Sequence, residues 1–166
     1  MMNIEFLEAV VWDGLFAAVA AIGFSVISNP PRKAIYVSAL LAAVGHSLRF
    51  FLMRNTSLDI GMASFFAAFA IGLLSILFAK IVRCPAEVFS FPSLLPMIPG
   101  MYAYKTVLGL VKFMQYANDD TSAAIMVDIF RNGITTVFVL SALVIGAAIP
   151  MFIFYKQSFM MTRLLK

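Results

Sequence analysis

The chain has 166 residues, of which 63% are hydrophobic and 12% are charged. Soluble domains are about half apolar and about a quarter charged, so this composition excludes a soluble globular protein and indicates an integral membrane protein. The net charge of +4 does not indicate a nucleic-acid partner, because the basic residues lie at the ends of apolar segments, as they do in membrane loops.

Two apolar segments of membrane-spanning length come first in the chain. The first covers residues 4–28 and has no basic residue before it, so we expect a retained span and not a signal peptide. A double proline and two cations, at residues 30–33, then mark a loop. The second segment, residues 34–52, contains His46 and Arg49, and we expect it either to cross the membrane or only to re-enter it.

The two segments that follow differ in regularity. Residues 60–79 are uncharged and predict an unbroken span. Residues 88–104 are uncharged too, but three prolines and a glycine lie between positions 92 and 100. Each proline removes a backbone donor and clashes with the preceding turn, so we expect a broken helix in which the carbonyls of Pro92 and Leu95 lose their usual partners. Broken backbone at membrane depth is tolerated only beside protein or a water-filled cavity, so the break predicts a cavity.

The C-terminal part of the chain completes the predicted bundle. Residues 106–116 predict an amphipathic continuation near the membrane surface, and residues 123–131 the beginning of a helix. The last span is expected at residues 132–155, with Asn132 as its cap. The sequence therefore predicts one all-α domain over residues 1–166, a polytopic membrane helix bundle with about five transmembrane segments, or four if the second segment only re-enters. The bias of Lys and Arg between the loops predicts an outside N-terminus and a cytoplasmic C-terminus.

Asp13 is a candidate ion-coupling residue. A carboxylate at membrane depth costs about 2.5–3.5 kcal/mol on insertion scales, so an Asp beside an uncharged stretch is consistent with a proton or cation site. The neighbouring Trp12 instead suits an interfacial position, where Asp13 would be solvated and would only end the helix. Both interpretations stay open.

His46 and Arg49 are candidates for binding an anion. Their spacing of three residues puts them within about 60° of each other on a helix. Together they would offer a guanidinium fork and a titratable imidazole to a carboxylate, and His46 is also a candidate for ion coupling. Gly45 beside them would allow a ligand or a helix to approach. Alternatively, Arg49 reaches the lipid headgroups and His46 bonds a neighbouring helix.

The proline-rich break supplies the remaining substrate-binding candidates, Pro96, Pro99, Gly100 and Tyr104. Freed carbonyls and the first amides of a half-helix starting near Gly100 would face the same cavity, and helix N-termini attract anions. Broken helices of this kind indicate the substrate site in transporters. The alternatives are a kink that only serves helix packing, and an aromatic-belt role for Tyr104.

Several motifs, taken in order along the chain, resemble those of the threonine/serine exporter family. They are the stretch that begins at Asp13, the loop at Asn29, the Gly-His-x-x-Arg block at residues 45–49 and the Pro-x-x-Pro-Gly block at residues 96–100. The resemblance is to the small membrane subunit of the two-subunit members and covers essentially the whole chain. The two blocks are its specific parts.

The resemblance implies a multi-pass protein of the bacterial plasma (inner) membrane that forms one half of a transporter. A larger subunit of the same exporter would supply the hydrophilic domain and the other spans. The implied substrates are small carboxylates, either threonine and serine or succinate and other dicarboxylates. Export would be driven by an ion gradient without ATP. The matching positions include Asp13, His46 and Arg49, but the family pattern does not say which of them touch substrate.

No catalytic residues are predicted. The sequence shows no nucleophile–base pair, no nucleotide-binding loop and no metal-ligand spacing, so we expect neither an enzyme nor a bound metal or cofactor. The predicted function is therefore one subunit of a secondary exporter of small carboxylates, with alternating access and proton coupling. The alternatives are a non-transporting membrane scaffold or assembly subunit, and a channel.

Overall fold

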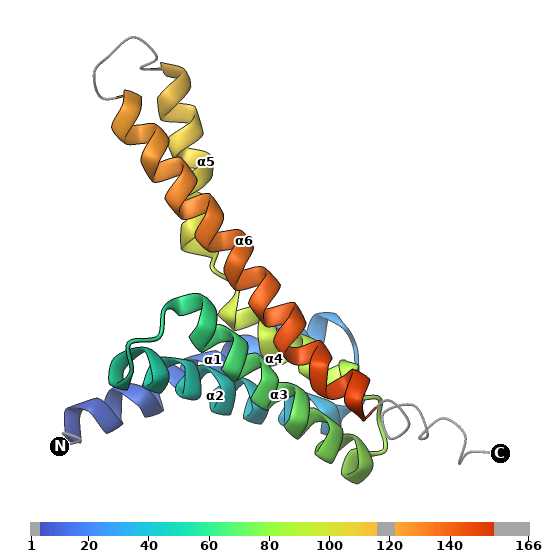
Figure 1. Cartoon of the computed structure of the whole chain (residues 1–166). Helices are drawn as coiled ribbons and strands as arrows, with labels where there is room; N and C mark the ends of the chain where they lie inside the picture. Colours follow the sequence, from blue (N-terminus) through green and yellow to red (C-terminus); the bar gives the residue numbers. More distant parts are fainter. Residues whose placement is uncertain (1–3, 116–121, 155–166) are drawn as a thin grey trace. The chain divides into compact units, whose positions relative to one another are not determined.

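The chain folds into α-helices. A computed structural model describes residues 4–115 and 122–154 (Figure 1). Its elements are α1 (Ile4–Ile27), α2 (Arg32–Asn55), α3 (Ile60–Val82), α4 (Glu87–Leu94), the 3-10 turn η1 (Leu95–Met97), α5 (Gly100–Gln115) and α6 (Ser122–Ile153). No strand occurs in the described residues, so the prediction of an all-α fold is confirmed.

The helix ends follow local sequence signals. After α1, Asn29 adopts a left-handed conformation (φ 47°), and Pro31 then precedes the first residue of α2. Asp59 caps α3, because its side chain accepts hydrogen bonds from the amides of Gly61 and Met62. Arg83 ends α3 in the left-handed region (φ 57°).

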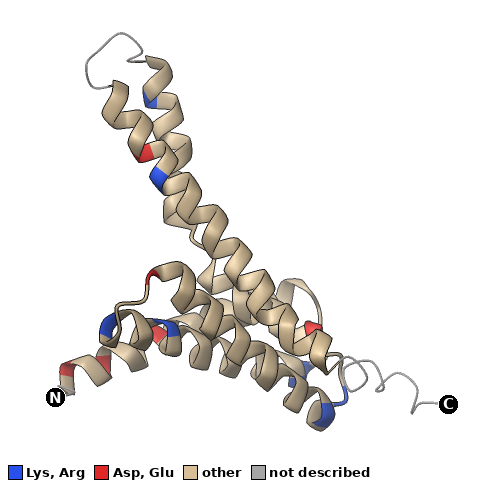
Figure 2. Cartoon of the chain, in the orientation of Figure 1, with Lys and Arg blue, Asp and Glu red and all other residues tan. Residues whose placement is uncertain are grey.

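Four of the described helices, α1, α2, α3 and α6, are long and apolar enough to cross a membrane. A fifth crossing exists if α4 and η1 together with α5 form one broken span. Figure 2 shows α3 and the later part of α6 without charge along most of their length. The chain is therefore a multi-pass membrane protein, and whether it has four or five spans depends on the broken segment. Residues 34–52 lie within the continuous 24-residue helix α2, which is itself long and apolar enough to cross a membrane.

The beginning of a helix expected at residues 123–131 is confirmed, and that helix runs without a break into the last span. Helix α6 begins at Ser122 and is continuous for 32 residues, with Asp128 and Arg131 inside it. Asn132 is consequently not a cap, and its side-chain amide donates to the carbonyl of Asp128 at 2.7 Å within the helix. The side chains of both charged residues are exposed on the helix.

The helix break predicted from the prolines is confirmed. Pro92 is the sixth of the eight residues of α4 and does not end the helix, although its absent donor leaves the carbonyl of Val88 without its usual partner. The helix then tightens into η1, which contains Pro96, and regular helix resumes only at Gly100. The backbone at Ile98 and Pro99 belongs to no helix.

The chain divides into two compact units. The second unit is residues Ile98–Ser141, which form α5 and the first part of α6, and the first unit contains the other elements with the end of α6. In the first unit α2 is central, in contact with α1, α3 and α4 (Figure 1). The buried hydroxyl of Ser93 on α4 lies 2.9 Å from the carbonyl of Ser38 on α2 and also contacts the carbonyl of Phe89 in its own helix, so this donor bridges the short helix and the bundle.

Candidate functional site

Three polar side chains form a chain of contacts through the first unit. The Nδ1 atom of His46 on α2 contacts the Oδ2 atom of Asp13 on α1. The other ring nitrogen, Nε2, lies 2.9 Å from an Nη2 atom of Arg49 one turn further along α2. The Nη1 atom of Arg49 donates to the carbonyl of Met97 at 2.9 Å. The chain therefore connects α1, α2 and the end of η1.

One glycine, Gly14, brings α1 and α2 close enough for this contact. A methyl group added to Gly14, the residue after Asp13, would overlap Oγ of Ser47, the residue after His46, and would lie 3.1 Å from the carbonyl oxygen of Ala43. The Ser47 hydroxyl also donates to the carbonyl of Val10 at 3.0 Å. The short distance between α1 and α2 at this level lets a short Asp side chain reach the imidazole.

The opposite side of α2 is held in the same way. A methyl group added to Gly45 would lie 2.7 Å from Cγ1 of Ile71 on α3 and 3.6 Å from Cε of Met97. Gly45 was expected to allow a ligand or a helix to approach, and the neighbour in the described structure is α3. His46 is thus placed by close packing of α2 on two sides.

The contact lies well inside the helices. Asp13 is about 14 Å along the axis from the first residue of α1 and about 21 Å from the last. His46 is about 21 Å from the first residue of α2 and about 14 Å from the last, as the antiparallel pairing of the two helices requires. The exposed fraction is 26% for the Asp13 side chain and 17% for the His46 side chain. These values indicate groups that are partly covered by protein.

The carbonyl that Arg49 contacts differs from the ones expected. The sequence pointed to Pro92 and Leu95, whose carbonyls lie four residues before a proline. The contact is made by Met97, the last residue of η1. In a continuous helix its carbonyl would accept from the amide of Met101, and the restart of the helix at Gly100 removes that partner.

The other predicted site residues lie along the break. Pro96 is half-buried in η1. Pro99, Gly100 and Tyr104 belong to the second unit. The amide of Gly100 donates to the carbonyl of Ile98 at 2.8 Å, so the first amide of α5 already has an acceptor. The Tyr104 side chain is exposed, as an aromatic-belt residue would be.

Most of the chain, including Asp13, His46 and Arg49, is similar in sequence to a known protein family. The family described as "Threonine/Serine exporter, ThrE" matches residues 13–153. The chain belongs to the threonine/serine exporter family. It is a family of membrane transporters and not of enzymes. The resemblance seen in the sequence is confirmed at this level.

A relative of this exporter-family chain occurs in Haemophilus influenzae (strain ATCC 51907 / DSM 11121 / KW20 / Rd), where it is described as an uncharacterized protein. The two sequences are 36% identical over 152 residues, which is 92% of this chain and 50% of the relative. The chain thus spans about half the length of that relative. No solved structure matches the chain.

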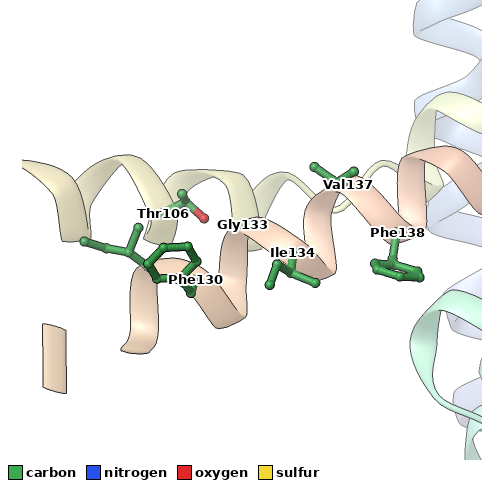
Figure 3. Close-up of a pocket in the computed structure, with 7 residues that line it drawn as sticks. Thr106, Phe130, Gly133, Ile134, Val137 and Phe138 are labelled. Carbon is green, nitrogen blue, oxygen red and sulfur yellow. The ribbon is translucent and has the colours of Figure 1, made fainter. Parts of the chain in front are cut away.

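The second unit of this exporter-family protein contains an open apolar groove of about 330 Å³ between Thr106 of α5 and one face of α6 (Figure 3). Thr106 contributes the polar side chain, and its hydroxyl donates to the carbonyl of Tyr102 at 2.9 Å. The other lining residues are Ile129, Phe130, Gly133, Ile134, Val137 and Phe138. A groove of this composition suits an apolar group and does not suit a carboxylate.

A second, more polar cavity of about 200 Å³ lies in the same unit. Lys105 and Lys112 of α5 line it together with Asp128 and Asn132 of α6. The three charged residues are exposed, so water screens their attraction for an anion. The better candidate for a carboxylate site is therefore Arg49, which His46 and Met97 hold in place.

The sequence missed the parts of the site that depend on tertiary structure. The side chain of Met97 does not indicate a role in the site, because only its backbone carbonyl contacts Arg49. Gly14 and Ser47 lie where α1 and α2 approach closely. Each is a small residue next to a predicted site residue, Asp13 or His46, and this pattern could have indicated the close approach.

Proposed function

We propose that the chain is the membrane subunit of a two-component secondary exporter of small carboxylates. The observation that carries the proposal is the polar chain from Asp13 through His46 and Arg49 to the Met97 carbonyl at the helix break. Charged side chains inside membrane helices are costly and usually mark substrate or ion pathways. Membership of the exporter family supports the same conclusion.

Arg49 would bind the carboxylate. A guanidinium carries five N–H donors in a planar fork. Two of them are engaged by His46 and Met97 in the described structure, which leaves three for a ligand. A carboxylate of threonine, serine or succinate can accept two parallel bonds from such a fork. We also propose Pro96, Pro99, Gly100 and Tyr104 as residues of the substrate path.

The break between η1 and α5 would allow alternating access. Half-helices that meet at mid-membrane let one part of a transporter move against another around a fixed site. Proton coupling would use Asp13 and His46, because imidazole titrates near physiological pH. We place the protein in the plasma membrane of a bacterium.

The second component would be the larger subunit of the exporter. The Haemophilus influenzae relative is about twice as long as the region that matches. An additional half, on the same or another chain, would provide the helices that complete the cavity. Secondary transporters are commonly built from two such repeats.

Counterflow tests the proposal. The chain and its partner are reconstituted in liposomes loaded with unlabelled substrate, and uptake of labelled threonine or succinate is compared. The Arg49→Ala variant is expected to lose at least about nine-tenths of the rate, which is the tenfold effect of losing about 1.4 kcal/mol of binding. Arg54→Ala is the matched control, because Arg54 lies on the same helix but packs over the Phe50 ring at 5.5 Å.

The result also separates the alternatives. Equal rates for the Arg49→Ala variant and the wild type would remove Arg49 from the mechanism. A flux that does not saturate would indicate a channel. Absence of any substrate-dependent exchange, with an intact complex, would indicate a scaffold or assembly subunit.

A further inference from the structure

The hydrogen bonds of His46 determine where its protons are. Arg49 has donors only and stays charged, so the nitrogen that it contacts must be an acceptor. Nε2 therefore carries a lone pair. A neutral imidazole then has its proton on Nδ1, which points at Asp13.

The hydrogen bonds of His46 also determine the protonation state of Asp13. If the carboxyl were the donor to Nδ1, both ring nitrogens of His46 would be acceptors, and the ring would be an imidazolate anion. The remaining arrangement is an ionised Asp13, a neutral His46 protonated on Nδ1 and a charged Arg49. The net charge of the three side chains is zero.

We infer that Nε2 of His46 is a proton-binding site whose occupation excludes the Arg49 contact, so that the protein binds a proton and a carboxylate together. The inference rests on the proposed function of Arg49 and deepens it. A proton from water that bonds to the Nε2 lone pair leaves an N–H directed at the N–H of Arg49. The Nδ1 proton stays with Asp13, and the net charge becomes +1.

The added charge links the proton to the ligand. Two cationic donors facing each other at 2.9 Å repel, so Arg49 must turn from His46, and the N–H that His46 had accepted is freed for a ligand as well. A carboxylate bound there restores a net charge of zero. Because such coupling is reciprocal, a carboxylate on Arg49 also favours the proton on His46.

Other charged groups near His46 do not alter this account. On α1 the remaining acids are Glu5 and Glu8, and Glu8 contacts Trp12 on the same helix. On α3 the charged residue is Lys80, in the last turn, and on α4 it is Glu87, in the first turn. The short turn η1 contributes the Met97 carbonyl and has no charged residue. Within the described part of the chain, Asp13 and Arg49 are the charged side chains in contact with His46.

The single histidine of the chain makes a direct test feasible. The chain, labelled with ¹⁵N-histidine and reconstituted with its unlabelled partner, is measured by solid-state NMR in liposomes over a pH series. At high pH we expect Nδ1 protonated and Nε2 unprotonated. At an intermediate pH, saturating succinate or threonine, added separately, should increase the ratio of doubly to singly protonated rings about tenfold.

Variants separate the parts of the inference. Arg49→Met should raise that ratio about tenfold without ligand and abolish the response to succinate. Glu8→Gln is the control on α1 and should behave as the wild type. A neutral ring protonated on Nε2, or an unchanged ratio in Arg49→Met, would overturn the proton site. A ratio that falls or stays constant on adding a carboxylate, in liposomes that show counterflow, would overturn the coupling. Coupling without any counterflow would instead contradict only the proposed function.

Discussion

The close approach of α1 and α2 at Gly14 predicts a large effect from adding one methyl group. In Gly14→Ala the new Cβ would overlap Oγ of Ser47 and press on the carbonyl oxygen of Ala43. The helices must separate, or Ser47 must rotate and lose its bond to Val10. The first change moves Asp13 away from His46, and the second removes a hydrogen bond that holds α1 against α2.

The magnitude follows from the contacts. Overpacking by one methyl group costs about 1–3 kcal/mol, and replacing a helical glycine by alanine returns about 0.5–1 kcal/mol. We expect Gly14→Ala to lower the free energy of unfolding by about 1–2 kcal/mol. Export should fall at least about tenfold, because a loss of about 1.4 kcal/mol of binding free energy at the displaced site already has that effect.

Gly23→Ala is a matched control on the same helix. A methyl group added to Gly23 meets no atom within 4 Å, so the same chemical change should be neutral or slightly stabilising. Unfolding in mixed micelles and counterflow in liposomes measure the two effects. Gly14→Ala with the stability and rate of Gly23→Ala would show that α1 and α2 do not approach each other as described. A Ser47→Ala change added to Gly14→Ala should restore part of the stability, since the overlapping hydroxyl is removed.

Two further predictions concern single polar groups. Asp13→Asn keeps the shape of the side chain and an acceptor for His46 but removes the charge. Export should therefore lose its dependence on pH while the complex still assembles. Transport measured from about pH 5 to 8, the range in which imidazole titrates, tests this prediction, with Glu8→Gln as the control. Retention of the wild-type pH profile would argue against Asp13 as a coupling residue. Ser93→Ala removes a buried donor and should lower the free energy of unfolding by about 0.6–1.5 kcal/mol. Ser28→Ala, at an exposed hydroxyl, should have little effect on the same unfolding curve, and an equal loss in both variants would contradict the tie between α4 and α2.

Local signals predicted most of the helices. The prolines and cations at residues 30–33 predicted the end of the first segment to within one residue of the observed end of α1. The prolines at residues 96 and 99 predicted the helix break. The beginning of a helix expected at residues 123–131 lies within one residue of the observed start of α6, but Asn132 was interpreted as a cap, so this helix was not joined to the last span. Hydropathy alone cannot separate a polar loop from the polar end of a long helix.

The candidate site was predicted in part. The spacing of His46 and Arg49 on one helix placed them together, because positions three apart share a helix face. Asp13 was selected by its cost at membrane depth, but its partner depends on how α1 and α2 pack. The Met97 carbonyl was not predictable from side-chain chemistry, since its availability depends on where the helix stops and restarts.

Helix α6 is longer than the hydrocarbon layer of a membrane. Its 32 residues extend about 48 Å, and the layer is about 30 Å thick. Even a tilted helix of this length therefore extends beyond the acyl chains at one end or both. Asp128 and Arg131 lie within ten residues of its first residue, and the residues from Asn132 to the end of the helix are uncharged. The beginning of α6 thus projects into the headgroup layer and the water beyond it, where solvent and phosphate can hydrate its charges.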